Sequence, residues 1–115
     1  MKSNEYFETM KKQAEAGEKF SSGANEAYLT WYYSQNEEEL RQDGHLWPKD
    51  VHDFIDTLRK AGIESFVTTE TSTILMELLH GFVAEGCTIT GTCTIIEDRG
   101  FKSEIKGIRI QIQNQ

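Results

Sequence analysis

Residues 62–95 read GIESFVTTETSTILMELLHGFVAEGCTITGTCTI. The segment 63–69 follows a glycine and is short and rich in β-branched and aromatic residues, which is typical of a strand. A wide apolar stripe then recurs at helical spacing as far as Gly86, where a left-handed glycine can end a helix, and the hydroxyl residues 71–73 can cap its start. The stripe consists of Ile74, Leu75, Leu78, Leu79, Phe82 and Val83.

Strict alternation predicts a second strand over residues 87–95. One face carries apolar residues and a glycine and the other only threonine, so we expect a core face and a polar face. The first face consists of Cys87, Ile89, Gly91, Cys93 and Ile95, and the second of Thr88, Thr90, Thr92 and Thr94. The order strand, helix, strand predicts that segments 63–69 and 87–95 run parallel through a right-handed crossover.

A hairpin completes the expected sheet. Residues 97–100 read EDRG and predict a turn, after which residues 105–113 return as an antiparallel third strand. Ile105 is out of phase with three later isoleucines unless Gly107 forms a bulge. Those three are Ile108, Ile110 and Ile112.

Two helices are expected before residue 41. Good helix formers occupy residues 3–16, and Ser21 or Ser22 can cap a second helix. That helix either frays near Glu37 or continues through Leu40, because carboxylates at a helix C-terminus oppose the helix dipole.

The middle of the chain connects the helices to the sheet. Residues 42–46 are turn-like and are the one linker-like stretch, and Pro48 then suits the first turn of a third helix. We therefore predict a single α+β domain over residues 1–115. Residues 1–61 would hold two or three helices, and residues 62–115 a strand-helix-strand-strand unit that forms a small mixed sheet.

Composition limits the classes of function. The 115 residues allow one compact core, and 12 Lys and Arg against 19 Asp and Glu give a net charge of −7. A negative surface repels phosphate, which disfavours direct binding of nucleic acid. No apolar run approaches the roughly 18 residues of a membrane span, and residues 1–5 open no signal peptide, so we expect a cytoplasmic protein without membrane contact.

The sequence contains no motif of catalysis or ligand binding. A nucleophile elbow, a P-loop and G-x-G-x-x-G are all absent. Cys87 and Cys93 would lie roughly 20 Å apart along an extended strand, so we expect two buried free thiols. Neither has a second ligand at metal-site spacing. We therefore predict that the protein is not an enzyme and has no catalytic residue, no cofactor and no metal.

Two pairs of histidine and carboxylate share a helix face. His52 and Asp56 are four residues apart, and Glu77 and His80 are three apart. The first pair lies opposite the apolar face of its helix, and the second lacks the additional copy that a di-iron bundle needs. We interpret both as surface residues. A small enzyme that uses His52 or His80 is the weakest alternative.

An acidic stretch begins at Glu37 and extends to Asp50. It has two interpretations: a solvated region that aids solubility, or a patch that docks on a basic surface of a partner, such as a groove that binds nucleic acid.

Aromatic residues near this stretch suggest a recognition surface, because aromatic side chains dominate the energetics of interfaces. Packing of Tyr28, Trp31 and Trp47 in the core explains most of them. Tyr32 and Tyr33 cannot both face that core, so at least one should be exposed. The tentative partner-binding residues are Tyr32, Tyr33, Glu37, Glu38, Glu39, Asp43 and Trp47.

A resemblance rests on a set of short motifs, which are GIESFVTT at residues 62–69, Ser72, LMEL at residues 75–78, Gly86-Cys87 and Gly91. As a set they resemble small proteins of unknown function found on mobile elements and prophages of Gram-positive bacteria. The likeness covers residues 50–112, with a looser match at residues 27–33. The resemblance implies that the protein comes from a phage or mobile element, and it implies no activity and no catalytic residue.

The leading hypothesis is a non-enzymatic protein-binding module of a phage or mobile element. Its most specific form is an anti-defence inhibitor of restriction or CRISPR nucleases, whose acidic surface occupies the basic channel of a nucleic-acid-processing protein. The alternative is a structural or regulatory protein that homodimerises through the third strand or the threonine face, and that Ile110→Lys would weaken.

Overall fold

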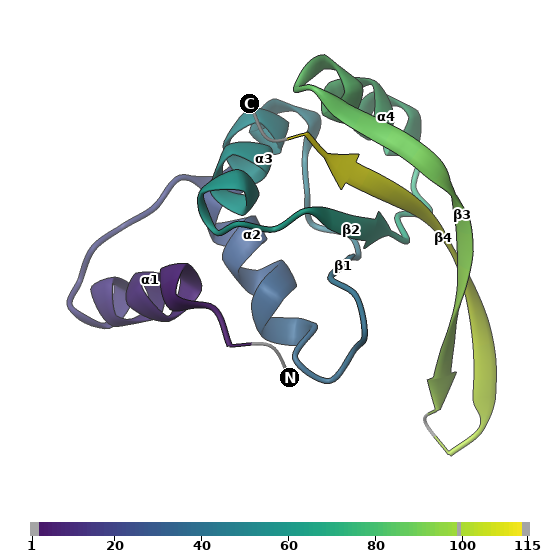
Figure 1. Cartoon of the computed structure of the whole chain (residues 1–115), viewed down its shortest axis with the longest axis horizontal. Helices are drawn as coiled ribbons and strands as arrows, with labels where there is room; N and C mark the ends of the chain where they lie inside the picture. Colours follow the sequence, from purple (N-terminus) through teal and green to yellow (C-terminus); the bar gives the residue numbers. More distant parts are fainter. Residues whose placement is uncertain (1–2, 99, 114–115) are drawn as a thin grey trace.

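A computed structural model describes residues 3–98 and 100–113. These residues form four α-helices, one short 3-10 helix and a four-stranded mixed sheet, which confirms the predicted α+β class (Figure 1). The helices are α1 (Glu5–Glu15), α2 (Ser22–Tyr33), the 3-10 helix η1 (Pro48–Asp50), α3 (Val51–Lys60) and α4 (Leu75–Ala84), and the strands are β1 (Arg41–Gln42), β2 (Ser65–Thr68), β3 (Cys87–Asp98) and β4 (Lys102–Ile112).

Local signals set most helix boundaries where the sequence predicts them. The Ser21 hydroxyl caps α2 by accepting a hydrogen bond from the Ala24 amide at 3.3 Å. Pro48 begins η1, which leads directly into α3. Gly62 follows α3 with a φ of 75°, the left-handed conformation that stops a helix.

The end of α2 differs from both predicted alternatives. The helix ends at Tyr33, so it neither frays near Glu37 nor continues through Leu40. Ser34 follows the last helical residue, and its hydroxyl accepts a hydrogen bond from the Arg41 amide at 3.0 Å. This contact turns the chain toward β1 and leaves the acidic residues on a loop.

The predicted cap of α4 is wrong. Ile74 precedes the helix, and no side chain caps its first turn. The Ser72 hydroxyl instead accepts a long hydrogen bond of 3.4 Å from the Ile74 amide, inside the turn before the helix.

The sheet has the strand order β1-β2-β4-β3. Its parallel pair is β1 with β2, in which Gln42 lies opposite Thr68. Gln42 belongs to the stretch predicted as a linker, and both it and Leu46 are buried. The linker prediction is therefore wrong. A strand of two residues is too short to show an alternation of apolar and polar residues, and its buried side chain is polar.

The two strands predicted to be parallel run in the same direction, but they are not neighbours in the sheet. β4 lies between β2 and β3 and is antiparallel to both, so β2 and β3 run in the same direction without a shared ladder. β4 is thus an interior strand and Ile110 is fully buried. The third strand is not available as a dimer edge, and Ile110→Lys would disrupt the core and not a surface contact.

A bulge in β3 changes which side chains share a face. The register shifts between Ile89 and Gly91, so Thr90 is an extra residue. Cys87 and Ile89 lie opposite Ile112 and Ile110, on the face that α3 and α4 cover, whereas the later odd-numbered residues turn to the other face. The predicted single core face is wrong, and the threonines are likewise divided between the two faces, although all four are exposed.

The bulge also explains the phase of Ile105. It pairs with Ile95 on the second face, and Gly107 pairs with Cys93 without a bulge. A Cβ at Gly107 would lie 2.5 Å from Val67 Cγ1, so the close approach of β2 accounts for this glycine. Cys87 is buried as predicted, but Cys93 on the second face is only half-buried.

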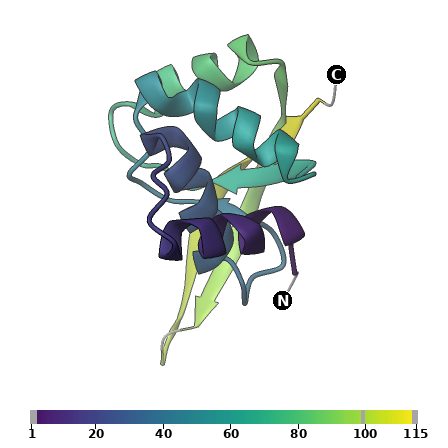
Figure 2. The same cartoon turned by 90° about the vertical axis from the view of Figure 1, so that its left-hand side faces the viewer.

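The β3–β4 hairpin is longer than predicted. Glu97 and Asp98 were expected in a turn, yet they pair with Ser103 and Lys102 as the last residues of β3. Arg99 lies outside the described residues. The resulting ribbon extends beyond the helices, as Figures 1 and 2 show.

The core lies between the helices and the first face of the sheet. Phe54 of α3, Phe66 of β2 and Phe82 of α4 contact one another with ring centroids 5.2 to 6.3 Å apart. Phe7 attaches α1 by stacking on Trp31 at 5.4 Å. Trp31 is therefore in the core as predicted, whereas Trp47 is 57% exposed and is not.

Candidate partner-binding groove

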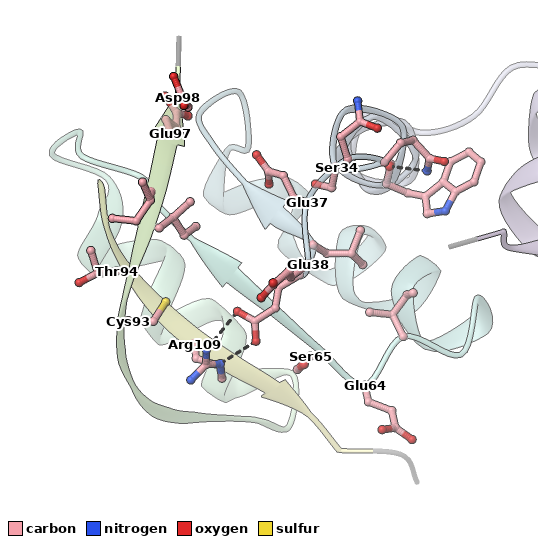
Figure 3. A pocket seen from close by; sticks show the side chains of 18 of the residues that line it. Ser34, Glu37, Glu38, Glu64, Ser65, Cys93, Thr94, Glu97, Asp98 and Arg109 are labelled. Atoms are coloured by element: carbon pink, nitrogen blue, oxygen red, sulfur yellow. Dashed lines mark hydrogen bonds and ion pairs between the residues drawn. The ribbon is translucent and has the colours of Figure 1, made fainter. Parts of the chain in front are cut away.

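An open groove of about 1230 Å³ lies on the second face of the sheet (Figure 3). The loop 34–40 between α2 and β1 forms one wall, and residues 93–98 of the projecting ribbon form the other. Residues 62–65 line one end, and Arg109 of β4 lies between the walls. Apolar atoms in the lining come from Trp31, Leu40, Ile63, Ile95 and Ile96.

The groove is strongly acidic. Among the described residues that line it, six carry carboxylates and one carries a positive charge, Arg109. The carboxylates come from three separate parts of the chain, and they are Glu37, Glu38, Glu39, Glu64, Glu97 and Asp98. Their concentration in one concave surface produces a negative electrostatic potential, which the low-dielectric walls of a cleft strengthen.

Arg109 and Glu39 connect the floor of the groove to its wall. Arg109 donates from Nε to Glu39 Oε1 at 3.0 Å and from Nη2 to Oε2 at 3.1 Å. This two-point geometry is the one in which a guanidinium group best fits a carboxylate. The hydrogen bonds to Glu39 raise the pKa of Arg109, so its guanidinium group keeps its charge at neutral pH.

Arg41 holds the ribbon against the loop from behind the lining. Its guanidinium group lies 3.7 Å from Glu37 and 3.2 Å from Asp43, and it donates to Glu97 at the end of β3. Its Nε also donates to the Thr69 hydroxyl at 3.0 Å. One cation therefore joins the loop, β1 and the ribbon.

The charges around Arg41 are partly buried. Burial alone would lower the pKa of Arg41, but the hydrogen bond to Glu97 and the nearby carboxylates outweigh it and raise that pKa. For Glu37 the balance is reversed, because burial raises the pKa of its carboxyl more than Arg41 lowers it. Arg41 thus offsets part of the cost of burying the Glu37 carboxylate.

The structure divides the predicted partner-binding residues into two sets. Glu37, Glu38 and Glu39 line the groove, and Asp43 is linked to it through Arg41. The three aromatic candidates are all exposed but are not part of the lining. They are Tyr32 and Tyr33 at the end of α2, which confirms the predicted exposure, and Trp47 before η1.

Sequence reasoning missed the opposite half of the groove. The sequence pattern places Glu97 and Asp98 in a turn and indicates no role for Glu64 or Arg109. A signal existed only for the adjacent acids Glu97 and Asp98, which repeat the acidic character of the loop. No local pattern indicates that residues this far apart in sequence meet across a groove.

Comparison with known families gives one match. The profile of a domain of unknown function, DUF7698, matches residues 24–112. The chain belongs to the DUF7698 family. No curated protein and no solved structure matches it. All residues that line the groove fall inside the DUF7698 domain, whereas α1 lies outside it.

Other candidate chemistry in this DUF7698 protein is dispersed. Over residues 3–98 and 100–113, no three His, Cys, Asp or Glu side chains gather in a way that would hold a metal ion. Glu77 and His80 are exposed on α4. No helix in the same residues is both long and apolar enough to cross a bilayer.

His52 has a different partner from the one that its spacing suggests. Its Nδ1 lies 2.7 Å from Glu85 Oε1 at the end of α4, whereas Asp56 pairs with Lys60 at 2.9 Å. The hydrogen bond to Glu85 raises the pKa of His52 above its ordinary value of 6.5. The stabilisation from this pair is therefore complete below pH 6.5 and is lost as the pH rises through the raised pKa.

We expect Glu85→Gln to return the pKa of His52 toward its ordinary value, because the charged acceptor is lost. An NMR titration of the His52 ring protons measures this change. Asp56→Asn is the control and should change the His52 pKa much less, since Asp56 contributes least among the charges that act on it. Equal shifts in both variants would contradict the pairing with Glu85.

Proposed function

We propose that this DUF7698 protein is a non-enzymatic binding module that docks its acidic groove on a basic surface of a protein partner. The excess of carboxylates in the groove supports this proposal most directly, since six of them meet one arginine in the lining. Charge complementarity of this kind accelerates association and selects partners of opposite sign. The same charge disfavours nucleic acid as the direct ligand.

The shape of the groove favours a protein segment over a simple cation. Its apolar lining gives the aliphatic stems of lysine or arginine a surface to pack on, while the carboxylates receive their charged ends. Within the fold, Arg41 and Arg109 already make contacts of this kind, since each binds a carboxylate of the loop 34–40. A partner that offers arginine would repeat contacts that this surface makes with its own side chains.

The most specific form of the proposal is an anti-defence inhibitor of a phage or mobile element. Its partner would be a nucleic-acid-processing protein, such as a restriction or CRISPR nuclease, whose basic channel the groove occupies in place of nucleic acid. Such an inhibitor acts in the cytoplasm. The net charge of −7 and the concave acidic surface are what support this form.

The decisive variant combines Glu38→Lys with Glu64→Lys. These two residues line the groove, and their reversal leaves in place the ion pairs of Arg41 with Glu37 and Glu97 and of Arg109 with Glu39. Reversal of Glu37, Glu39 or Glu97 would break those ion pairs. We expect the double variant to bind a fluorescent arginine-rich peptide at least tenfold more weakly, about 1.4 kcal/mol, as measured by anisotropy.

The matched control is Glu15→Lys with Glu18→Lys. Both residues are exposed near the end of α1, away from the groove, and the variant has the same net charge as the first. It should retain wild-type affinity for the peptide and, in a panel of purified restriction and CRISPR nucleases, wild-type inhibition. Equal losses in both variants would show a general charge effect and overturn the groove assignment. Absence of binding and inhibition by the wild-type protein would overturn the proposed function.

A further inference from the structure

The outer edge of β3 is an unpaired sheet edge in the part of the chain that the structure describes. β3 is the last strand in the order β1-β2-β4-β3 and, in the described residues, it pairs only with β4. Its residues 87–96 contain no charged side chain and no proline. Proteins usually protect such edges with lysine, proline or a bulge, and the bulge at Thr90 leaves the stretch after it regular.

We propose that two copies of this chain pair along this edge, with β3 of one copy antiparallel to β3 of the other. The backbone groups on the outer side of β3 would then complete a continuous sheet in the order β1-β2-β4-β3-β3-β4-β2-β1. The exposed side chains of Ile89 and Ile96 would be partly covered by the partner strand. This pairing does not depend on what the groove binds.

The absence of charged residues along 87–96 is the reason to choose a second copy as the occupant. Each chain has a net charge of −7, so two copies repel one another over most approaches. The stretch 87–96 is a place where they can meet without opposing carboxylates. Antiparallel pairing also keeps Glu97 and Asp98 away from their own copies, whereas parallel pairing would stack them on those copies.

The threonines of β3 make this edge compatible with itself. Thr88, Thr90, Thr92 and Thr94 are all exposed, and threonine pairs across strands are favourable in antiparallel ladders. A symmetric pair needs such a self-complementary surface, since each residue of one copy meets a residue of the same strand in the other.

The symmetry fixes where the two grooves lie. Two identical antiparallel strands at an edge are related by a two-fold axis perpendicular to the sheet, so equivalent faces point in the same direction. Both acidic grooves would therefore open on one side of the dimer. A partner with two basic sites would then bind with a higher effective concentration at the second site.

The first experiment compares wild type with Thr92→Lys. Sedimentation equilibrium should give the wild-type chain twice its mass of 13.2 kDa, falling to the monomer on dilution. The variant places a lysine at the edge and near its copy across the two-fold axis, so its dissociation constant should rise at least tenfold. A circular dichroism melt of each protein verifies that the variant is folded.

The matched control is Gln111→Lys. Gln111 is exposed on β4, one strand inside the edge, so it adds lysine to the same sheet away from the proposed contact. It should retain the wild-type dimer. A wild-type protein that stays monomeric at every concentration would overturn the inference. A dimer that Thr92→Lys leaves intact would also overturn it, by placing the contact elsewhere.

Discussion

Gly23→Ala should lower the free energy of unfolding by about 3 kcal/mol, at the upper end of the cost of overfilling a packed site. Gly23 is buried in the first turn of α2, where that helix crosses η1 and α3. An added Cβ would lie 2.8 Å from Asp53 Cβ and 3.0 Å from the Phe54 amide nitrogen, and it would overlap the Asp50 carbonyl oxygen. Two of these atoms are backbone, and Phe54 is fixed in the core, so the helices cannot separate without losing packing.

Helix propensity makes the opposite prediction for this substitution, because alanine is better than glycine in a helix interior by about 1 kcal/mol. Urea denaturation of the wild type and the variant distinguishes the two expectations. Ser22→Ala is the matched control, since Ser22 is the exposed neighbour in the same turn, and it should change stability by less than about 0.5 kcal/mol. An increase in stability on Gly23→Ala would contradict the close crossing of α2 over α3.

The helices could be predicted because each carries its own signals. Ser21, Pro48 and Gly62 act on neighbouring backbone groups, so their effect is visible within a few residues of sequence. The apolar stripe of α3 likewise reports burial directly, and Phe54 and Leu58 are fully buried. These features do not depend on any distant part of the chain.

The presence of a small mixed sheet could be predicted, but the order and register of its strands could not. The alternation of residues 87–95 continues unbroken through Thr90, and only the pairing with β4 shows that the strand changes face there. The phase of Ile105 was the one trace of that change in the sequence. β1 was missed because its buried Gln42 is satisfied by contacts with Gly44 and Thr68, which no local pattern reveals.

The candidate groove could be predicted only partially. The run from Glu37 to Glu39 is a dense local charge that the sequence shows directly, and it does line the groove. Glu97 and Asp98 meet it because the ribbon is long enough to return toward the loop, and that length follows from strand pairing. The run has a further role that composition cannot show, because Glu37 and Glu39 bind arginines of the same chain.

Arg41→Met should lower the free energy of unfolding by about 3 kcal/mol, because it removes the cation from a largely buried ion pair with Glu97. The side chain of Arg41 is only 10% exposed, and that of Glu97 only 16%. Methionine preserves most of the apolar stem, so the measured loss reports the charge.

Arg109→Met is the matched control. Its pair with Glu39 has good two-point geometry, but the side chains are 40% and 39% exposed, so water replaces the contact and the loss should be below about 1 kcal/mol.

The pH dependence of stability gives the Arg41 prediction its sharpest test. The pKa of Glu37 is already raised by burial, and removal of the opposing charge of Arg41 raises it further. A carboxyl with a raised pKa binds its proton more tightly in the folded state, so its contribution favours folding at low pH and is lost as the pH rises through that pKa. Urea denaturation should therefore show the deficit of Arg41→Met fully at neutral pH and reduced in acid. Adding Glu37→Gln and Glu97→Gln should restore much of the stability at neutral pH, whereas a deficit that persists would show that Arg41 acts through packing alone.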